Sequence, residues 1–224
     1  MEIKKEKGLI IALDRMEPAV FFGYLGWLQT LKGNFAIKIG RPLEMVFAKN
    51  GLNHPLLHAR DKLKDKLPII YDGKIADIPF ISAQIAEDAY EMGADAVIMH
   101  GFMGEDVVQE VISLGKPVIL VVAMSNSGST EYLDQVSKSL AWMCNGLEIE
   151  GIVLPATRPV VIEKIKELIL PSTFIISPGI KAQGAQPGDA IRAGADYEVV
   201  GRAITGANDP KAAAEALYQQ ILES

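Results

Sequence analysis

The sequence has little cysteine and little histidine, the residue types from which disulfide frameworks and most zinc sites are built. Its single cysteine, Cys144, excludes an intrachain disulfide and any zinc site that needs several cysteines. His54 and His58 have the i, i+4 spacing of one helix face, but no carboxylate motif accompanies them. We therefore expect no metal site, and we expect Cys144 to serve packing rather than nucleophilic chemistry.

The chain also lacks an excess of positive charge and a long apolar run. Its 22 Lys and Arg residues are outnumbered by 28 Asp and Glu residues, which gives a net charge of -6. This balance argues against nucleic acid or a membrane surface as a partner. No apolar stretch reaches the roughly 18–20 residues that span a bilayer. The first seven residues are mostly charged and lack the apolar core of a signal peptide, so we expect a soluble, cytoplasmic protein.

Short apolar runs alternate with longer amphipathic segments along the whole chain. Eight runs have the composition of strands covered on both faces, at residues 9–13, 35–39, 68–71, 96–99, 117–122, 151–154, 173–177 and 197–200. Helical patterns lie between them, for example at residues 81–92, 105–114, 160–170 and 209–222. The alternation predicts an α/β fold, a single (β/α)8 TIM barrel with residues 1–224 as one catalytic domain. A doubly wound open sheet is the alternative, but it usually needs fewer strands.

In a barrel of this kind the active site lies at the C-terminal ends of the strands, so polar residues should gather there. They follow or end six of the eight predicted strands: Asp14, Lys38, Asp72, Lys74, His100, Ser125 and Arg202. We expect His100 to pack or to orient a loop, because the other polar residues already include an acid for proton transfer.

The densest polar cluster is the segment 72–77, Asp-Gly-Lys-Ile-Ala-Asp. In an extended chain, side chains two residues apart point the same way, so Asp72 and Lys74 can both face the barrel mouth. Carboxylates close to Lys74 favour its ammonium form. Such a lysine is a good proton donor and a poor Schiff-base nucleophile. A surface network of ion pairs is the alternative interpretation of this cluster.

A second cluster follows the seventh and eighth predicted strands, where TIM barrels commonly bind phosphate. The segment 177–184, Ser-Pro-Gly-Ile-Lys-Ala-Gln-Gly, is followed later by Gly201 and Arg202. Glycine lets a backbone approach an anion closely, and arginine makes two-pronged contacts with phosphate oxygens. Gln183 can add an amide donor. A glycine-rich turn with a structural arginine is the alternative.

These segments together resemble the orotidine 5'-monophosphate decarboxylase family, particularly its compact archaeal form. The signature is Asp-Gly-Lys-Ile-Ala-Asp-Ile-Pro at residues 72–79. Further matching segments span nearly the whole chain in the family's order, at residues 13–14, 38–40, 100–102, 124–125, 177–180 and 200–202. The Asp-x-Lys-x-x-Asp core is shared with related sugar-phosphate enzymes, whereas the Ile-Pro continuation and the loop with Gln183 favour the nucleotide decarboxylase.

The resemblance implies decarboxylation of orotidine 5'-monophosphate to uridine 5'-monophosphate in pyrimidine biosynthesis, with no metal and no cofactor. Lys74 would protonate C6 of the pyrimidine as the carboxylate leaves, beside Asp72. Lys38 and Asp77 would add further charges beside Asp72 and Lys74, with Asp77 supplied by the neighbouring subunit of a homodimer. The remaining matching residues would bind the substrate: Asp14 at the ribose, Ser125 at the pyrimidine, and Gln183, Gly201 and Arg202 at the 5'-phosphate.

Two positions depart from the family's pattern. Ile81 stands where many members have threonine, and Asn126-Ser127-Gly128 replaces a segment that often reads His-Pro. We expect a changed contact to the ribose and a differently built loop over the base. Two other functions are considered: a metal-dependent sugar-phosphate decarboxylase or aldolase, and a non-catalytic phosphoribosyl-binding protein. The complete set of Asp72, Lys74 and Asp77 argues against the second of these.

Overall fold

Eight parallel strands close into a barrel in chain order in the computed structural model, which describes residues 3–224. Residues 1 and 2 of the predicted domain lie outside the described residues. The strands are β1 (Gly8–Leu13), β2 (Phe35–Gly40), β3 (Ile69–Ile75), β4 (Ala96–His100), β5 (Val118–Val121), β6 (Gly151–Val153), β7 (Phe174–Pro178) and β8 (Tyr197–Val200). The eight strands and the (β/α)8 barrel expected from the sequence are confirmed.

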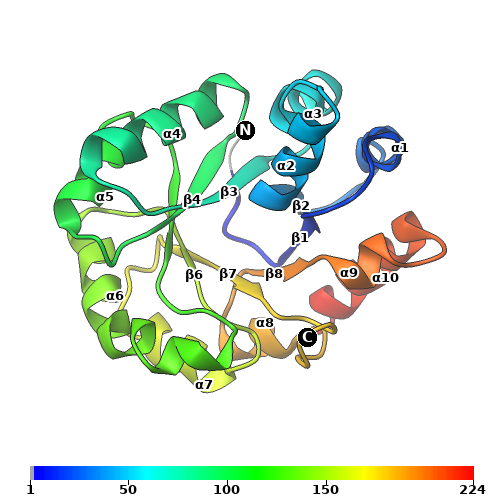
Figure 1. Ribbon diagram of the computed structural model, residues 1–224. Coiled ribbons are helices and arrows are strands. Elements are labelled where there is room, and N and C mark those ends of the chain that lie inside the picture. The colour runs from blue at the N-terminus through cyan, green and yellow to red at the C-terminus, as the bar shows by residue number, and fades with distance from the viewer. Residues whose placement is uncertain (1–2) are drawn as a thin grey trace.

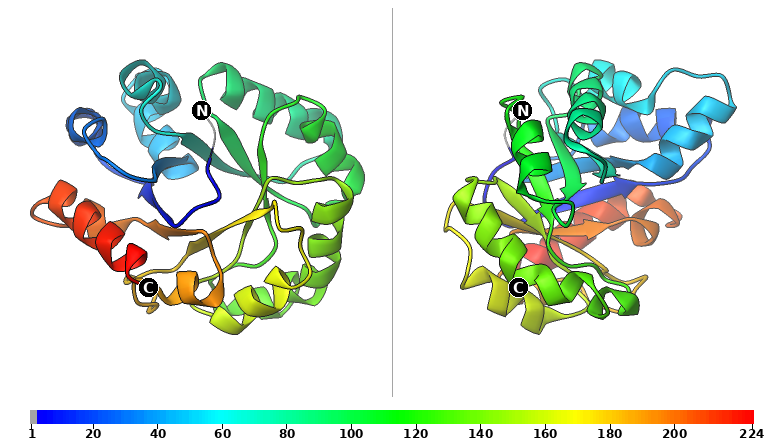
Figure 2. Two further views of the ribbon diagram at one scale, coloured as in Figure 1. Left: turned by 180° about the vertical axis from the view of Figure 1, so that it is seen from behind. Right: turned by 60° about the vertical axis from the view of Figure 1, so that its left-hand side comes forward.

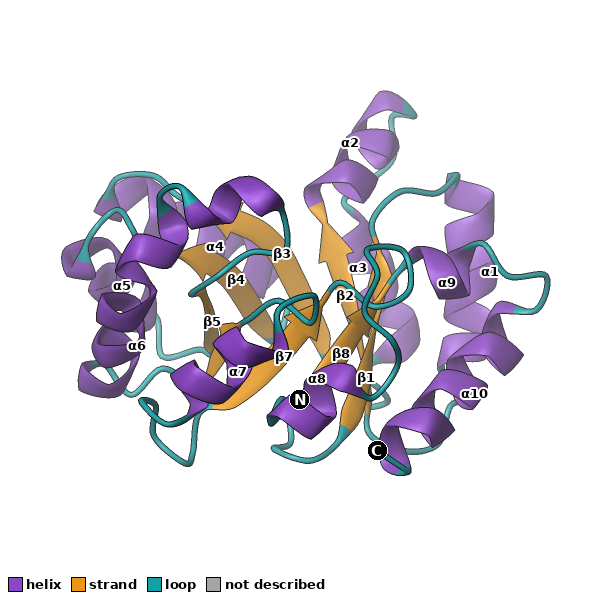
Figure 3. Cartoon of the chain, turned by 90° about the horizontal axis from the view of Figure 1, so that it is seen from below, coloured by secondary structure: helices purple, strands orange, loops and turns teal. Residues whose placement is uncertain are grey.

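Helices form a ring outside the barrel (Figure 1), and the strands lie inside this layer when the molecule is turned (Figure 3). The α-helices are α1 (Pro18–Leu28), α2 (Arg41–Lys49), α3 (Pro55–Leu63), α4 (Pro79–Glu91), α5 (Glu105–Ile112), α6 (Ser137–Gly146), α7 (Pro159–Lys166), α8 (Asp189–Ala193), α9 (Arg202–Thr205) and α10 (Pro210–Leu222). Two short 3-10 helices, η1 (Ser127–Thr130) and η2 (Leu133–Val136), lie between β5 and α6. The predicted helix stops Gly93 and Gly115 have positive φ angles of 105° and 68°, which glycine adopts without strain.

The strands are apolar on both sides because each side faces a different part of the core. Ile10 and Ala12 belong to the cluster inside the barrel, whereas Leu9, Ile11 and Leu13 pack against the surrounding helices. This alternation follows from the two-residue period of a strand. It also fixes which side chains at a strand's C-terminal end can reach the barrel mouth.

The start of the chain packs against the N-terminal end of the barrel interior, and α10 packs on the outside of the barrel near the same end. The Tyr197 hydroxyl donates to the Lys4 carbonyl at 2.6 Å and lies 3.0 Å from the side-chain oxygen of Asn34. The Tyr218 hydroxyl accepts from the Asn34 N–H at 2.8 Å. The last helix therefore returns to the first strands, which Figure 2 shows by the red helix coming round to the blue strand. None of the helices within residues 3–224 is long and apolar enough to cross a membrane.

The strand β3 is longer than the sequence predicts. It was expected to end at residue 71, but it continues to Ile75 and includes Asp72 and Lys74. Its register with β4 shifts between Tyr71 and Ile75, and Lys74 has a φ of 43°. The bulge explains the difference, because pairing with β4 resumes only after the irregular residues.

Candidate active site

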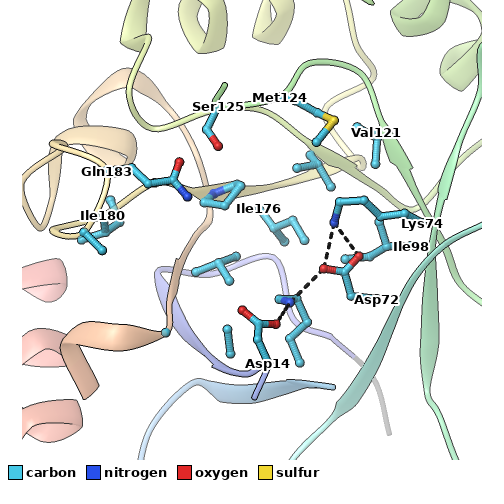
Figure 4. Close-up of a pocket in the computed structure, with 18 of the residues that line it drawn as sticks. Asp14, Asp72, Lys74, Ile98, Val121, Met124, Ser125, Ile176, Ile180 and Gln183 are labelled. Carbon is cyan, nitrogen blue, oxygen red and sulfur yellow. Dashed lines mark hydrogen bonds and ion pairs between the residues drawn. The ribbon is translucent and has the colours of Figure 1, made fainter. Parts of the chain in front are cut away.

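A cavity of about 320 Å³ opens at the C-terminal ends of the strands. Eight of the nine site residues expected from the sequence line it: Asp14, Lys38, Asp72, Lys74, Ser125, Gln183, Gly201 and Arg202. Figure 4 shows Asp72 and Lys74 on one side of the cavity, with Ser125 and Gln183 across it. Six different strands contribute these side chains or the loops that carry them. The barrel thus brings together residues that are up to 188 positions apart in the chain.

Two lysines and two aspartates form a continuous chain of ion pairs on the strand side of the cavity, and we call these four residues the charged array. Lys38 Nζ lies 2.6 Å from Asp14 Oδ1 and 2.8 Å from Asp72 Oδ2. Lys74 Nζ lies 2.7 Å from Asp72 Oδ1 and 2.9 Å from Asp72 Oδ2. The Asp72 carboxylate is therefore shared by both lysines, and the dashed lines in Figure 4 mark its two contacts with Lys74.

The bulge in β3 determines how Lys74 reaches Asp72. A fully extended strand would place the two side chains side by side, but the left-handed φ of Lys74 turns the backbone at this residue. The ammonium nonetheless contacts both oxygens of Asp72. The Lys74 side chain is 41% exposed, whereas those of Lys38 and Asp72 are each 9% exposed. Lys74 is thus much more accessible than Lys38 and Asp72, the two inner members of the charged array.

The electrostatics of the charged array keep its buried members ionised. Burial would lower the pKa of Lys38, but Asp72 and Asp14 outweigh it, and the pKa lies above its ordinary value. Burial would likewise raise the pKa of Asp72, but Lys38 and Lys74 hold it below the ordinary value. A buried carboxylate and a buried ammonium are stable here because each has its partner within hydrogen-bond distance.

The opposite side of the cavity is formed by two loops. Gln183 lies in the segment between β7 and α8, together with Ile180 and Ala182, and Gly201 and Arg202 directly follow β8. Arg202 is exposed at the start of α9. Between this side and the charged array the wall is apolar, formed by Ile98, Val121, Met124, Val153, Ile176 and Val199 among others. The cavity therefore offers a cationic and amide-bearing end, an apolar middle and a charged end.

Asp77 is the one predicted site residue that the structure does not bring to this cavity. It is exposed in the turn after β3, where its Oδ1 accepts from the Ile78 N–H at 2.7 Å. The fully buried Ser82 holds this turn: its hydroxyl donates to the Asp77 carbonyl at 3.0 Å and accepts from the Asp77 N–H at 3.2 Å. Ser82 thus points into the protein and is not available to replace the threonine that Ile81 displaces.

Comparison with known proteins places this geometry in a family. Residues 7–217 match the model of the Orotidine 5'-phosphate decarboxylase / HUMPS family. An orotidine 5'-phosphate decarboxylase from Thermococcus kodakarensis is 47% identical over 223 residues, covering 98% of this chain and 99% of the relative. One from Pyrococcus furiosus is 34% identical, covering 98% and 94%. The chain belongs to this family. The resemblance expected from the sequence is confirmed.

Solved structures of the family have the same fold. The orotidine 5'-monophosphate decarboxylase of Methanocaldococcus jannaschii, in complex with the inhibitor BMP, superposes with a TM-score of 0.84 at 30% identity. The alignment covers 96% of this chain and 99% of that one. The enzyme from Pyrococcus horikoshii gives a TM-score of 0.81 at 33% identity, with 96% and 99% covered.

One charged residue that supports the loop carrying Ser125 was not predicted from the sequence. Arg158, just before α7, donates to the carbonyl of Met124 and pairs with Asp134. Asp134 in turn accepts from the Ser129 hydroxyl at 2.7 Å, and Ser129 accepts from the Met124 N–H at 3.2 Å. This network, which we call the Arg158 clamp, fixes the loop that carries Ser125. The strand-end rule could have found Arg158, because it follows β6 in the segment Leu-Pro-Ala-Thr-Arg.

The remaining titratable residues lie outside the cavity lining. His100 is buried at the end of β4, and its ring centroid lies 4.9 Å from that of Phe102. Burial has the largest effect and lowers the pKa of His100; the charge of Lys74 lowers it further, and the charge of Asp72 opposes both. Cys144 is buried in α6, and burial raises the pKa of its thiol to about 12. His54 accepts from the Leu56 N–H at 3.2 Å, and His58 packs against aromatic rings. Residues 3–224 contain no group of three or more His, Cys, Asp or Glu side chains that could hold a metal ion.

Proposed function

We propose that this chain decarboxylates orotidine 5'-monophosphate to uridine 5'-monophosphate in pyrimidine biosynthesis, with Lys74 as the proton donor and without a cofactor. Membership of the family and the two curated relatives named for this activity support the reaction. The single observation that carries the mechanism is the contact of the Lys74 ammonium with both oxygens of Asp72 inside the cavity. We further propose that residues 1–224 form one catalytic domain and that it acts in the cytoplasm.

The proposed chemistry follows from the charge arrangement. The bond between C6 and the carboxylate carbon breaks, carbon dioxide leaves, and the electron pair remains on C6. A fixed ammonium at that carbon stabilises the developing negative charge, because it is already in place and needs no reorganisation. Lys74 then transfers a proton to C6 and becomes a neutral amine, which regains a proton from solvent. Asp72 lies beside the departing carboxylate in this arrangement, while Lys38 keeps the charge of Asp72 balanced.

The rest of the cavity would hold the nucleotide. The phosphate would bind at the cationic end, to Arg202, the Gln183 amide and the Gly201 N–H, because charge-assisted contacts to phosphate oxygens are the strongest available there. Asp14 would accept from the ribose hydroxyls, and Ser125 would bind the edge of the pyrimidine. The apolar middle of the cavity excludes water from the base. Binding the remote phosphate raises the rate only where its energy positions the base for reaction.

We also propose a homodimer in which Asp77 reaches the cavity of the other subunit. Asp77 does not line the cavity of its own chain, and it lies beside large exposed apolar side chains. Ile78 is 62% exposed and Phe80 is 64% exposed, and Phe102, which follows the neighbouring strand β4, is 58% exposed. Apolar surface of this kind next to a functional residue is typical of an interface. A second copy would cover this apolar surface and would bring its own Asp77 to the charged array.

The decisive experiment is an assay with orotidine 5'-monophosphate after exhaustive treatment with EDTA. We expect release of carbon dioxide and uridine 5'-monophosphate at an unchanged rate. Loss of turnover that Mg²⁺ restores would favour the metal-dependent sugar-phosphate chemistry. Tight binding of uridine 5'-monophosphate with no turnover would favour the non-catalytic binding protein.

Subunit mixing tests the shared site. Lys74→Ala and Asp77→Ala are each expected to be inactive as pure proteins. After subunit exchange, one of the two sites in a mixed dimer regains both residues, so we expect activity to return in part. Exchange demonstrated by a mass tag without any recovered activity would contradict the contribution of Asp77 across the interface.

A further inference from the structure

Strand β8 contains a buried acid that the proposed chemistry does not use. Glu198 has an exposure of 0%, and it lies between Tyr197 and Val199, whose side chains point into the barrel. By the alternation of a strand, the carboxylate of Glu198 points to the layer between the barrel and the helices. That layer is otherwise built from apolar side chains. A buried charge in such a place is costly unless it makes specific hydrogen bonds.

The hydrogen bonds of Glu198 all go to one end of one loop. Its Oε1 accepts from the N–H of Gly188 at 2.9 Å and from the N–H of Ala190 at 3.1 Å. Gly188 is the residue that precedes α8, and its φ of 88° requires glycine. Within residues 3–224 the second oxygen, Oε2, has no hydrogen-bond partner. Burial raises the pKa of Glu198, and these backbone donors oppose that effect.

The loop between β7 and α8 is held at both ends by neighbouring residues of β7 and β8. The loop leaves β7 after Pro178, and the preceding residue, Ser177, is the register partner of Glu198 on β8. The Ser177 hydroxyl is itself fixed, because it donates to the Leu154 carbonyl at 2.7 Å. The other end of the loop is held at Gly188 by Glu198. Gln183 lies in the loop between these two held ends and lines the cavity.

The interior of the loop is stiff enough to transmit this anchoring. Ile180 and Ala185 form a β-bridge across it. The Lys181 N–H donates to the Ala185 carbonyl at 2.7 Å, and the Ala185 N–H donates to the Gly179 carbonyl at 3.3 Å. A loop with such internal hydrogen bonds moves as a unit, so the position of its ends determines the position of its tip.

We infer that Glu198 is a positioning residue for phosphate binding: it holds the loop with Gln183 in a fixed place relative to Arg202, which follows the same strand. Glu198 lies on β8, and Arg202 follows four residues later as the first residue of α9. One strand thus sets the spacing between the two side chains that contact the phosphate in the proposed function, on which this inference rests. Glu198 itself does not line the cavity.

Two substitutions of similar size test the inference. Glu198→Met removes both acceptor oxygens and fits an apolar layer, so we expect it to fold. Glu198→Gln keeps an oxygen for the two N–H groups. We expect the Kd for uridine 5'-monophosphate to rise about tenfold in Glu198→Met, because the N–H groups of Gly188 and Ala190 lose the acceptor that holds the loop with Gln183 in place. In Glu198→Gln it should stay within about twofold of the native value.

Coupling to Gln183 separates positioning from a general loss of stability. In a Gln183→Ala background the loop has lost its phosphate donor, so Glu198→Met should weaken binding by less than about threefold. Tyr197→Phe is the matched control. It removes the partly buried hydroxyl contacts of the same strand with Lys4 and Asn34, at the far end of the barrel, and should leave the Kd unchanged.

The outcomes distinguish this inference from the proposed function. If the native protein fails to bind uridine 5'-monophosphate, the proposed function is wrong. If the native protein binds it and Glu198→Met binds it equally well, Glu198 has no positioning role. Equal weakening by Glu198→Met with and without Gln183 would also overturn the inference, because the effect would then not act through the loop.

Discussion

The two sides of the cavity are built in opposite ways. The charged array is carried by strands or the residues directly after them, and its central members Lys38 and Asp72 are buried and paired at 2.8 Å. The phosphate side is carried by loops, and both Gln183 and Arg202 are exposed. The difference matches the tasks proposed for them. A group that must meet one carbon atom benefits from side chains that are buried and paired, whereas a remote anion can be bound by exposed donors on a loop that is held at its ends.

Removing the strand-borne acid should have the largest effect. We expect Lys74→Ala to lower kcat by roughly 10⁴-fold or more, because it removes both the proton donor and the charge at the reacting carbon. Asp72 keeps its contact with Lys38, so the fold should persist. Calorimetry should still detect binding of uridine 5'-monophosphate. Lys211→Ala on the surface of α10 is the control, and near-native turnover of Lys74→Ala would refute the mechanism.

Changing the loop side should weaken binding more than it slows chemistry. Arg202→Ala removes a charge-assisted contact, and we expect KM for orotidine 5'-monophosphate to rise about 10- to 100-fold. The expected decrease in kcat is smaller. The control is Arg41→Ala, measured by the same steady-state kinetics. Arg41 also follows a strand, but it does not line the cavity. A decrease in kcat as large as that of Lys74→Ala, with KM unchanged, would abolish the distinction between the two sides.

The Arg158 clamp should have an intermediate effect, because it acts on the loop that carries Ser125 and not on the substrate. Arg158→Met leaves the Met124 carbonyl and Asp134 without their guanidinium partner. We expect KM to rise by about three- to tenfold, the effect of one or two lost hydrogen bonds. Steady-state kinetics of the native protein and of Arg158→Met, at several temperatures below the unfolding transition, measure the change in KM. An unchanged KM would show that the loop keeps its place without the clamp.

The smallest effect concerns His100 and pH. Burial and Lys74 lower the pKa of folded His100 below its ordinary value of 6.5. The unfolded chain therefore takes up this proton first as the pH falls, and the free energy of unfolding should decrease below about pH 6.5. Denaturant titrations of the native chain and of His100→Gln at pH 7, 6 and 5 should show a weaker pH dependence for the variant. Parallel curves would indicate that folded His100 titrates normally.

The comparison between the two sides also separates what the sequence could predict from what it could not. Asp14, Lys38 and Arg202 were found by a rule about strand ends, which needs only the positions of short apolar runs. The bulge at Lys74 was missed, because it depends on how β3 pairs with β4. The Arg158 clamp joins two loops that are distant in the chain. Glu198 was visible as one charged residue within an apolar run, but its partners are backbone groups that sequence patterns do not identify.

The alternation of charges in the array has a consequence for the evolution of the protein. Asp14, Lys38, Asp72 and Lys74 follow one another so that each inner member has an opposite charge on both sides. Loss of Lys38 would leave Asp14 without its ion pair, and loss of Asp72 would leave the buried ammonium of Lys38 with a single carboxylate. A lineage that drifts away from this chemistry is therefore expected to lose an end member of the array, Asp14 or Lys74, before the inner members Lys38 and Asp72, because loss of an inner member leaves a charged neighbour with fewer partners.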